Sequence, residues 1–416
     1  MKKMKKLVAT LMALAMVFVL AACGNSGSTN TEELDLQAAS WEDIVSAAKG
    51  TTVAYYGYGG DEQINQWLDN YVAPAVKEKY DVTLTRTAMG ADEYMAKMTN
   101  EKQAGTTVGD MDILWINGEN FYNAKEQGMI YGPIVNKLPM YEKYYDAESK
   151  DNTLDFAYPT EGYEAPFSKA QFVLIGDTSK VSFLPNSAEQ LLDFVKAYPG
   201  KFTYPEATDF TGSAFIRNII YELVGYDALA ACKADDVEGL KKTIQPAMDY
   251  LKELKPYLWR NGDTYPSDGA QLDQLFSDGE IFLTMSYNPL DAAAMIEKGT
   301  YPETAQTFVF EKGMIGNTSF LAIPTTAPNK AGAMVVIDFI LDAESQLNKY
   351  DPKVAGKLPV IDNNKLTDEQ KAAFAAVDLG KGTLAQDYLA SHMIPEVSAS
   401  LVPVIEQIWR DTVLAN

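Results

Sequence analysis

Four polar segments of the chain carry the residue types that bind small solutes in proteins. The first, Gly57 to Asp61, follows an apolar β-forming run and precedes a helical pattern. Its glycines allow backbone N–H groups to approach an anionic or carbonyl oxygen, and Tyr58 can stack on a ring or an alkylammonium group. The predicted ligand contacts are Tyr58, Gly59, Gly60 and Asp61. The alternative is a tight strand-to-helix turn with no ligand.

The second segment offers amides and a carboxylate after another apolar strand. Asn117 and Asn120 can donate and accept hydrogen bonds, and Glu119 can pair with a cationic solute. The alternative is an asparagine helix cap beside a solvated glutamate. Both interpretations fit the sequence equally well.

The third and fourth segments complete the predicted ligand site. Thr211, Gly212 and Ser213 open an apolar helix, and their hydroxyls and backbone donors would suit an oxyanion or a polar head group. Ordinary helix capping competes with that interpretation. Tyr287 and Asn288 end an apolar strand just before a helix, so we expect them close to the same ligand.

No familiar catalytic or metal motif accompanies these segments. The chain has one histidine and two cysteines, Cys23 and Cys232, which excludes an HExxH pair and a Cys/His zinc cluster. It has neither a GxSxG elbow nor a P-loop. We therefore predict no catalytic residue, no metal and no cofactor. A glycoside hydrolase that uses two carboxylates is retained as a weak alternative.

The elements that position these segments alternate between strand and helix. Strands are predicted over 51–56, 81–85, 110–116, 172–176 and 281–286, with helices over 40–50 and 188–197 among others. Such alternation predicts α/β sheets covered by helices, with ligands at the carboxyl ends of the strands. A further group, Tyr141, Tyr144 and Tyr145, is predicted to form an exposed helical face.

The N-terminus reads as an export signal. Lysines at positions 2, 3, 5 and 6 precede an apolar run, Leu7 to Leu20, which is too short to span a membrane. The next residues, through Ala22 and Cys23, resemble the bacterial lipobox, where cleavage before the cysteine exposes a thiol that is lipidated. We predict a signal peptide over 1–22 and a lipid-anchored flexible tether over 23–40, rich in Gly, Ser, Asn and Thr.

The remaining chain is strongly acidic. Because the four signal lysines belong to a total of 35 basic residues, 31 basic and 57 acidic residues remain, a net charge of −26. That charge repels nucleic acid and anionic lipid, so nucleic-acid binding is excluded. It favours a cationic ligand, although a solvated secreted surface explains it as well.

The chain resembles the extracellular solute-binding proteins of bacterial ABC importers, in their two-lobed class. Within that class it is similar to a subgroup akin to the thiamine, iron and polyamine binders, whose glycine pair usually follows tryptophan where this chain has Tyr58. The segments that carry the resemblance are Trp41 to Asp61, Asp110 to Ile130, Pro166 to Phe172, Leu275 to Ile281 and Phe320 to Ala333.

The resemblance implies a type II periplasmic-binding-protein fold of two α/β lobes joined by hinges. Lobe I is expected over 41–165 plus 313–345, and lobe II over 170–307 plus 347–416. The expected function is non-enzymatic: the lobes close on a small solute and deliver it to a membrane permease driven by a cytoplasmic ATPase. We expect a monomer, lipid-anchored through Cys23 on the extracellular face of the membrane. Acidity and aromatic residues favour a cationic or heteroaromatic solute; a carbohydrate is the alternative.

Overall fold

The computed structural model describes residues 34–415. The predicted signal peptide, Cys23 and most of the predicted tether lie outside these residues. In the short stretch before residue 40, the carbonyl oxygen of Asp35 accepts hydrogen bonds from the N–H groups of Ala38 and Ala39, at 3.0 and 2.8 Å. Residues from Ser40 onward form one compact unit, which contains all the sheets described below.

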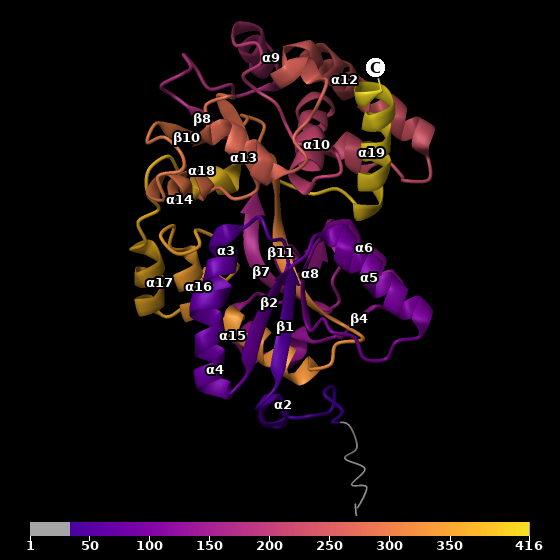
Figure 1. The fold of residues 1–416 in the computed structure, drawn as a ribbon, viewed down its shortest axis with the longest axis vertical. Coiled ribbons are helices and arrows are strands. Elements are labelled where there is room, and N and C mark those ends of the chain that lie inside the picture. The colour runs from indigo at the N-terminus through magenta and orange to yellow at the C-terminus, as the bar shows by residue number, and fades with distance from the viewer. Residues whose placement is uncertain (1–33, 416) are drawn as a thin grey trace, which may run out of the picture. The chain divides into compact units, whose positions relative to one another are not determined.

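The larger sheet is built around β1 and β11 (Figure 1). Strand β1 pairs in parallel with β2 and β3, and β11 pairs antiparallel with β3, β4 and β7 and parallel with β12. Buried apolar residues such as Val53 and Leu114 fix which faces of β1 and β3 turn inward. The bounds are β1 (Thr52–Gly57), β2 (Thr83–Ala88), β3 (Ile113–Ile116), β4 (Ile130–Tyr131), β7 (Glu164–Gln171), β11 (Met314–Pro324) and β12 (Met393–Pro395).

A smaller antiparallel sheet has β8 between β10 and β9. The described residues also contain a short two-stranded ribbon of β5 and β6. Every residue of β8 is buried, which accounts for its unbroken apolar run Val173 to Ile175. The bounds are β5 (Leu154–Asp155), β6 (Tyr158–Pro159), β8 (Val173–Asp177), β9 (Leu283–Ser286) and β10 (Ala305–Phe308).

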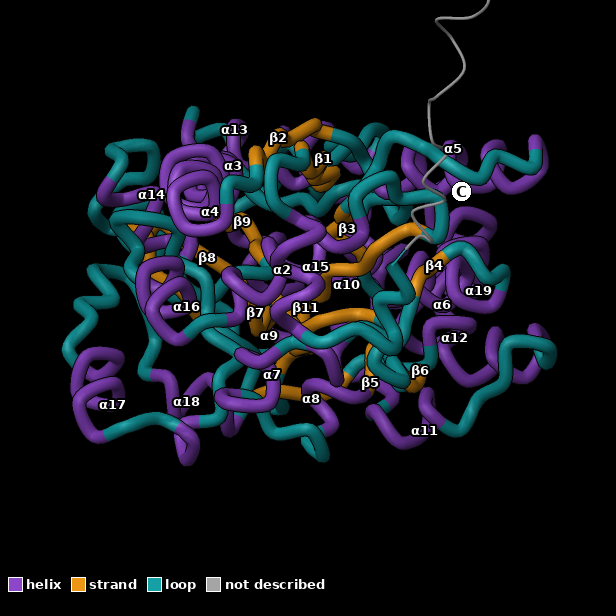
Figure 2. The backbone as a smooth tube through the Cα atoms, turned by 90° about the horizontal axis from the view of Figure 1, so that it is seen from below, coloured by secondary structure: helices purple, strands orange, loops and turns teal. Residues whose placement is uncertain are grey.

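Helices pack around both sheets, as the purple segments of Figure 2 show. They are α2 (Trp41–Ala48), α3 (Glu62–Trp67), α4 (Ala73–Tyr80), α5 (Ala91–Ala104), α6 (Gly118–Glu126), α7 (Pro139–Tyr144), α8 (Lys150–Thr153), α9 (Ala188–Ala197), α10 (Phe210–Val224), α11 (Tyr226–Ala230), α12 (Val237–Leu254), α13 (Gly269–Ser277), α14 (Asp291–Glu297), α15 (Lys330–Leu341), α16 (Ala343–Tyr350), α17 (Asp368–Ala375), α18 (Gln386–Ser391) and α19 (Val402–Trp409). No helix among the described residues has both the length and the apolar composition needed to cross a membrane.

We call the larger sheet with α2–α7 and α15 the first lobe, and the smaller sheet with α9–α14 and α19 the second lobe. The chain passes from one sheet to the other at Phe172, between β7 and β8, and returns between Phe308 and Met314. Residues after α15 bond back to the first lobe, since Asp362 N–H donates to Tyr144 O and Gln370 Nε2 to Tyr144 Oη. The lobe boundaries given above stay a prediction, but these bonds favour a later boundary than residue 347.

The predicted exposed tyrosine face is wrong. Tyr141, Tyr144 and Tyr145 are all buried, and the Tyr145 hydroxyl donates to Leu341 O at 3.1 Å. The reason is that the face of the short helix α7 that carries the tyrosines packs against α15, while Glu142 and Lys143 stay exposed. Helical spacing in a six-residue helix could not reveal this packing.

Candidate functional site

The segment from Gly57 to Asp61 joins β1 to α3 in the first lobe. Asp61 is the N-cap of α3, and its Oδ1 accepts from Ile64 N–H at 3.1 Å. Tyr58 is 43% exposed and folds back over Gly60, where a Cβ atom would lie 2.3 Å from the tyrosine oxygen. Gly60 is thus required so that Tyr58 can occupy this position.

The hydroxyl of Tyr58 faces carboxylates of the second lobe. Burial, followed by the charges of Asp268 and Asp209, raises the pKa of Tyr58 to about 12. Asp268 caps α13 and Asp209 caps α10, so two helix entrances of the second lobe turn toward this first-lobe loop. The predicted contact Tyr58 therefore lies where the lobes meet.

The entrance of α10 is closed by its own cap. Asp209 Oδ1 accepts from the N–H groups of Thr211 and Gly212, both at 2.9 Å. A Cβ at residue 212 would meet the backbone of Pro205 and Glu206 within 2.4 Å, so only glycine fits. The expectation that these donors are free is wrong: the partly buried carboxylate of Asp209 uses them, which disfavours an oxyanion at this helix.

A buried network that the sequence analysis missed lies behind Ser213. Arg217 is 1% exposed and forms a two-pronged ion pair with Glu396, with Nε–Oε2 and Nη2–Oε1 distances of 3.0 and 2.7 Å. Tyr287 Oη also donates to Glu396 Oε1 at 2.7 Å. Ser213 Oγ donates to Glu406 Oε1 at 2.6 Å and accepts from Arg217. The sequence signal that could have revealed this network is Arg217 itself, a basic residue inside the apolar run of α10.

Tyr287 and Asn288 thus have internal partners. The Tyr287 ring packs against those of Phe210 and Phe172, with centroids 5.0 and 5.8 Å apart. Asn288 is 7% exposed, and its Oδ1 accepts from Leu290 N–H at the start of α14. Both residues hold the β9–α14 connection in place, and a direct contact with solute stays a prediction.

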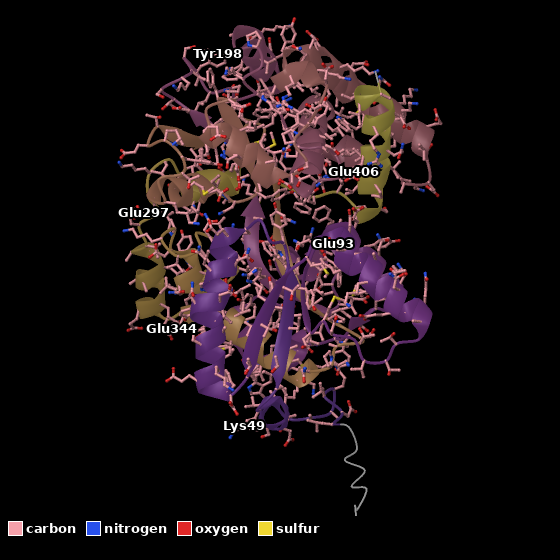
Figure 3. The ribbon with its side chains drawn as sticks, viewed as in Figure 1. Lys49, Glu93, Tyr198, Glu297, Glu344 and Glu406 are labelled. Carbon is pink, nitrogen blue, oxygen red and sulfur yellow. The ribbon has the colours of Figure 1, made fainter. Side chains whose placement is uncertain are left out.

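Glu119 lies near a second carboxylate across the lobes. Burial, and then the charge of Glu406 on α19, raises the pKa of Glu119 to about 7, while Arg217 acts in the opposite direction. Glu406 on α19 and Glu93 on α5 lie on the same side of the molecule in Figure 3. A carboxylate held in this way is ready to ionise fully when a cation arrives.

The neighbours of Glu119 shape its loop. Gly118 has a φ of +58° and donates to the buried Asp155, and its missing Cβ leaves room for the ring of Phe156. Asn117 is the N-cap residue of α6, and its Nδ2 donates to Thr318 O at 3.4 Å. Asn120, like Glu119, is partly exposed.

Lys357 and Asp61 form an ion pair at the other end of this interface. Their Nζ–Oδ2 distance is 2.7 Å, and the two side chains are 13% and 12% exposed. Asp291 on α14 and Asp273 on α13 also act on the Lys357 charge. The basic groups Arg217 and Lys357 are thus each already paired with a carboxylate.

The structure brings several predicted residues to the surfaces where the lobes face each other, namely Tyr58, Asp61, Glu119 and the α10 entrance. Acidic side chains are concentrated there, with Asp209, Asp268 and Asp273 near Tyr58. Within residues 34–415, no group of three His, Cys, Asp or Glu side chains could hold a metal ion. Two hollows of about 330 and 440 Å³, one beside β7 and one between α12 and α19, include none of the predicted contacts.

Comparison with known proteins gives a consistent family assignment. The sequence pattern of a family described as bacterial extracellular solute-binding protein matches residues 70–376. Protein YnjB of Escherichia coli strain K12 is 35% identical over 378 residues, covering 90% of this chain and 94% of that protein.

Solved structures agree in fold. An ABC transporter substrate-binding protein from Bradyrhizobium japonicum has a TM-score of 0.60 at 18% identity, covering 87% of this chain and 99% of that one. AfuA from Actinobacillus pleuropneumoniae, with fructose-6-phosphate bound, has a TM-score of 0.58 at 17% sequence identity. The match covers 87% of this chain and 98% of AfuA. The spermidine/putrescine-binding PotD from Streptococcus pneumoniae has a TM-score of 0.56 at 16% sequence identity. The match covers 86% of this chain and 99% of PotD.

Proposed function

The chain belongs to the bacterial extracellular solute-binding protein family, as the substrate-binding protein of an ABC transporter, and from this premise we propose that its solute is a small organic cation. The predicted type II periplasmic-binding-protein fold is confirmed, and the chain is a transport protein rather than an enzyme. The proposed ligand contacts are Tyr58 to Asp61, Asn117, Glu119, Asn120, Thr211 to Ser213, Tyr287 and Asn288.

One observation carries the proposal: acidic residues of the two lobes lie near one another where the lobes face each other. Glu119 of the first lobe lies near Glu406 of the second, and Tyr58 of the first lobe lies near Asp209 and Asp268 of the second. Burial, and then neighbouring carboxylates, raise the pKa of Glu119 to about 7 and that of Asp209 to about 6, and a cation beside them would favour their ionised forms. Tyr58 would add its aromatic face to an alkylammonium group or a heteroaromatic ring.

The proposal extends to anchoring and delivery. Cleavage before Cys23 and lipidation of its thiol would hold the protein at the extracellular face of the membrane through the stretch up to residue 40. There the monomer would hand its solute to the permease and the cytoplasmic ATPase. PotD, a structural neighbour named for spermidine and putrescine, makes a polyamine a reasonable first probe.

Solutes of graded charge test the proposal. We expect spermidine or thiamine to raise the unfolding free energy, by about 2.7 kcal/mol at one hundred times its Kd, in a thermal-shift titration. The effect should weaken between 0.05 and 0.5 M NaCl, because salt screens partly exposed charges. Maltose and fructose 6-phosphate are the neutral and anionic controls. A shift with maltose alone would favour the carbohydrate alternative, and a shift with the phosphate alone would contradict a cationic solute.

Tyr58→Ala should weaken the binding of whichever cation succeeds. Loss of one aromatic contact costs about 1–2 kcal/mol, so Kd should rise about tenfold in isothermal titration calorimetry. Tyr388→Ala is the matched control, since this tyrosine is 42% exposed and lies on α18. Equal affinities of wild type and Tyr58→Ala would remove this loop from the site.

A further inference from the structure

Lys357 occupies an unusual place between the lobes. Its ammonium meets Asp61 at the start of α3 in the first lobe, and both side chains are nearly buried. Asp291 and Asp273, on α14 and α13 of the second lobe, also raise its pKa, while burial lowers it. The positive charge of Lys357 therefore interacts with carboxyl groups of both lobes.

The backbone around Lys357 is tied to the strand on which the chain passes between lobes. Lys357 N–H donates to Lys349 O at 3.1 Å, and the next residue, Leu358, accepts from Lys169 N–H of β7 at 3.1 Å. The lysine is thus held at the crossing strand, while its side chain extends to the facing surfaces of the lobes.

The neighbouring Lys349 interacts with a backbone carbonyl and a hydroxyl instead of with carboxylates. Its ammonium is fully buried and donates to Phe167 O and to Ser168 Oγ, and no carboxylate of the described residues forms an ion pair with it. Burial, with the charge of Lys357 second, holds the pKa of Lys349 well below its usual range. Within residues 34–415, Lys357 is the one of these two lysines that forms an ion pair with a carboxylate.

Other contacts place α3 against α14. Lys298 pairs with Glu62 at 3.0 Å, and Gln63 Nε2 lies 3.7 Å from Met295 Sδ. The Lys298–Glu62 pair is more exposed, with Glu62 70% accessible, and such pairs contribute little. The Lys357–Asp61 pair, with side chains 13% and 12% exposed, is the better shielded from solvent.

We propose that Lys357 is a latch: held at the crossing strand, it draws α3 of one lobe and α14 of the other together before any solute arrives. The inference rests on capture by lobe closure, but not on the identity of the solute. Without the ammonium, Asp61 would lose its counter-charge beside Asp291, so we expect the lobes to separate. Lys357 is a positioning residue here, since it acts through the carboxylates.

Hydrogen exchange of the unliganded full-length protein tests the latch. In Lys357→Met we expect amides of α3 and α14 to exchange at least tenfold faster than in wild type, while amides of β11 keep their protection. Lys357→Arg should retain most of the protection because it keeps the charge. Lys353→Met, an exposed lysine of the same segment, is the matched control and should change nothing.

Each result of the exchange experiment either supports or overturns the latch. Unchanged exchange in Lys357→Met would overturn the proposal, as would faster exchange that includes β11, because the role would then be one of global stability. Measuring hydrogen exchange of the wild type with added spermidine tests the proposed cationic solute separately from the latch. Loss of protection in Lys357→Met with no spermidine effect on wild type would support the latch and reject only the solute.

Discussion

Replacing Arg217 by methionine is expected to lower the free energy of unfolding by about 3–5 kcal/mol. Arg217 joins α10 to Glu396, just after β12, through two hydrogen bonds in a dry environment. Methionine would fill a similar volume but would leave Glu396, 4% exposed, with the Tyr287 hydroxyl as its one remaining side-chain donor among the described residues. An uncompensated buried charge costs far more than the ion pair itself contributes.

Urea denaturation followed by circular dichroism would measure this loss. Lys196→Met is the matched control, because Lys196 and Glu253 pair at 2.9 Å with side chains 41% and 55% exposed. Its cost should stay within about 1 kcal/mol. Similar losses in the two variants would contradict the view that the Arg217 network organises the second lobe.

Glu119→Gln is expected to stabilise the protein at pH 8 by about 2 kcal/mol and to leave it unchanged at pH 4. The folded-state pKa of Glu119 is raised from 4.5 to about 7, so the folded protein binds the proton more tightly than the unfolded chain. The contribution of the Glu119 carboxyl to the free energy of unfolding is fully present below pH 4.5 and is lost as the pH rises through about 7. Each pKa unit corresponds to about 1.4 kcal/mol, reduced here because the side chain is partly exposed.

The same substitution should impair function. At pH 8 the glutamine lacks the charge that a cation would meet, so the Kd for spermidine should rise about tenfold. In the wild type the affinity should fall as the pH drops below 7, because the proton then competes with the solute. Glu78→Gln, at an exposed position on α4, should affect neither property. A Glu119→Gln variant that binds spermidine normally would place the solute elsewhere.

Local sequence predicted the elements well because their signals are local. The strands predicted at 51–56 and 172–176 occur as Thr52–Gly57 and Val173–Asp177, and the helix at 188–197 is α9. Ser40 caps α2 at the start of the helix predicted over 40–50, with its Oγ accepting from Asp43 N–H at 3.2 Å. β-Forming runs and capping residues act over a few positions, so one sequence is enough to recognise them.

The interactions between distant segments could not be predicted in the same way. Arg217 and Glu396, or Asp61 and Lys357, meet only because several crossings of the chain bring them together. The Thr211–Ser213 entrance looked open because its acceptors, Asp209 and Glu406, are identified by geometry and not by spacing alone. Polar residues near the lobe interface were recognisable, whereas their partners were not.

The position of β11 has a consequence for the order of assembly. Ile116 of β3 pairs with Phe320, and Gly316 at the other end of β11 pairs with Pro395. A chain that emerges N-terminus first, from a ribosome or through a membrane channel, therefore has no partner for this edge of β3 until most of its length is out. Contacts so distant in sequence form slowly. The sheet of the first lobe therefore cannot be completed until β11, and then β12, have emerged.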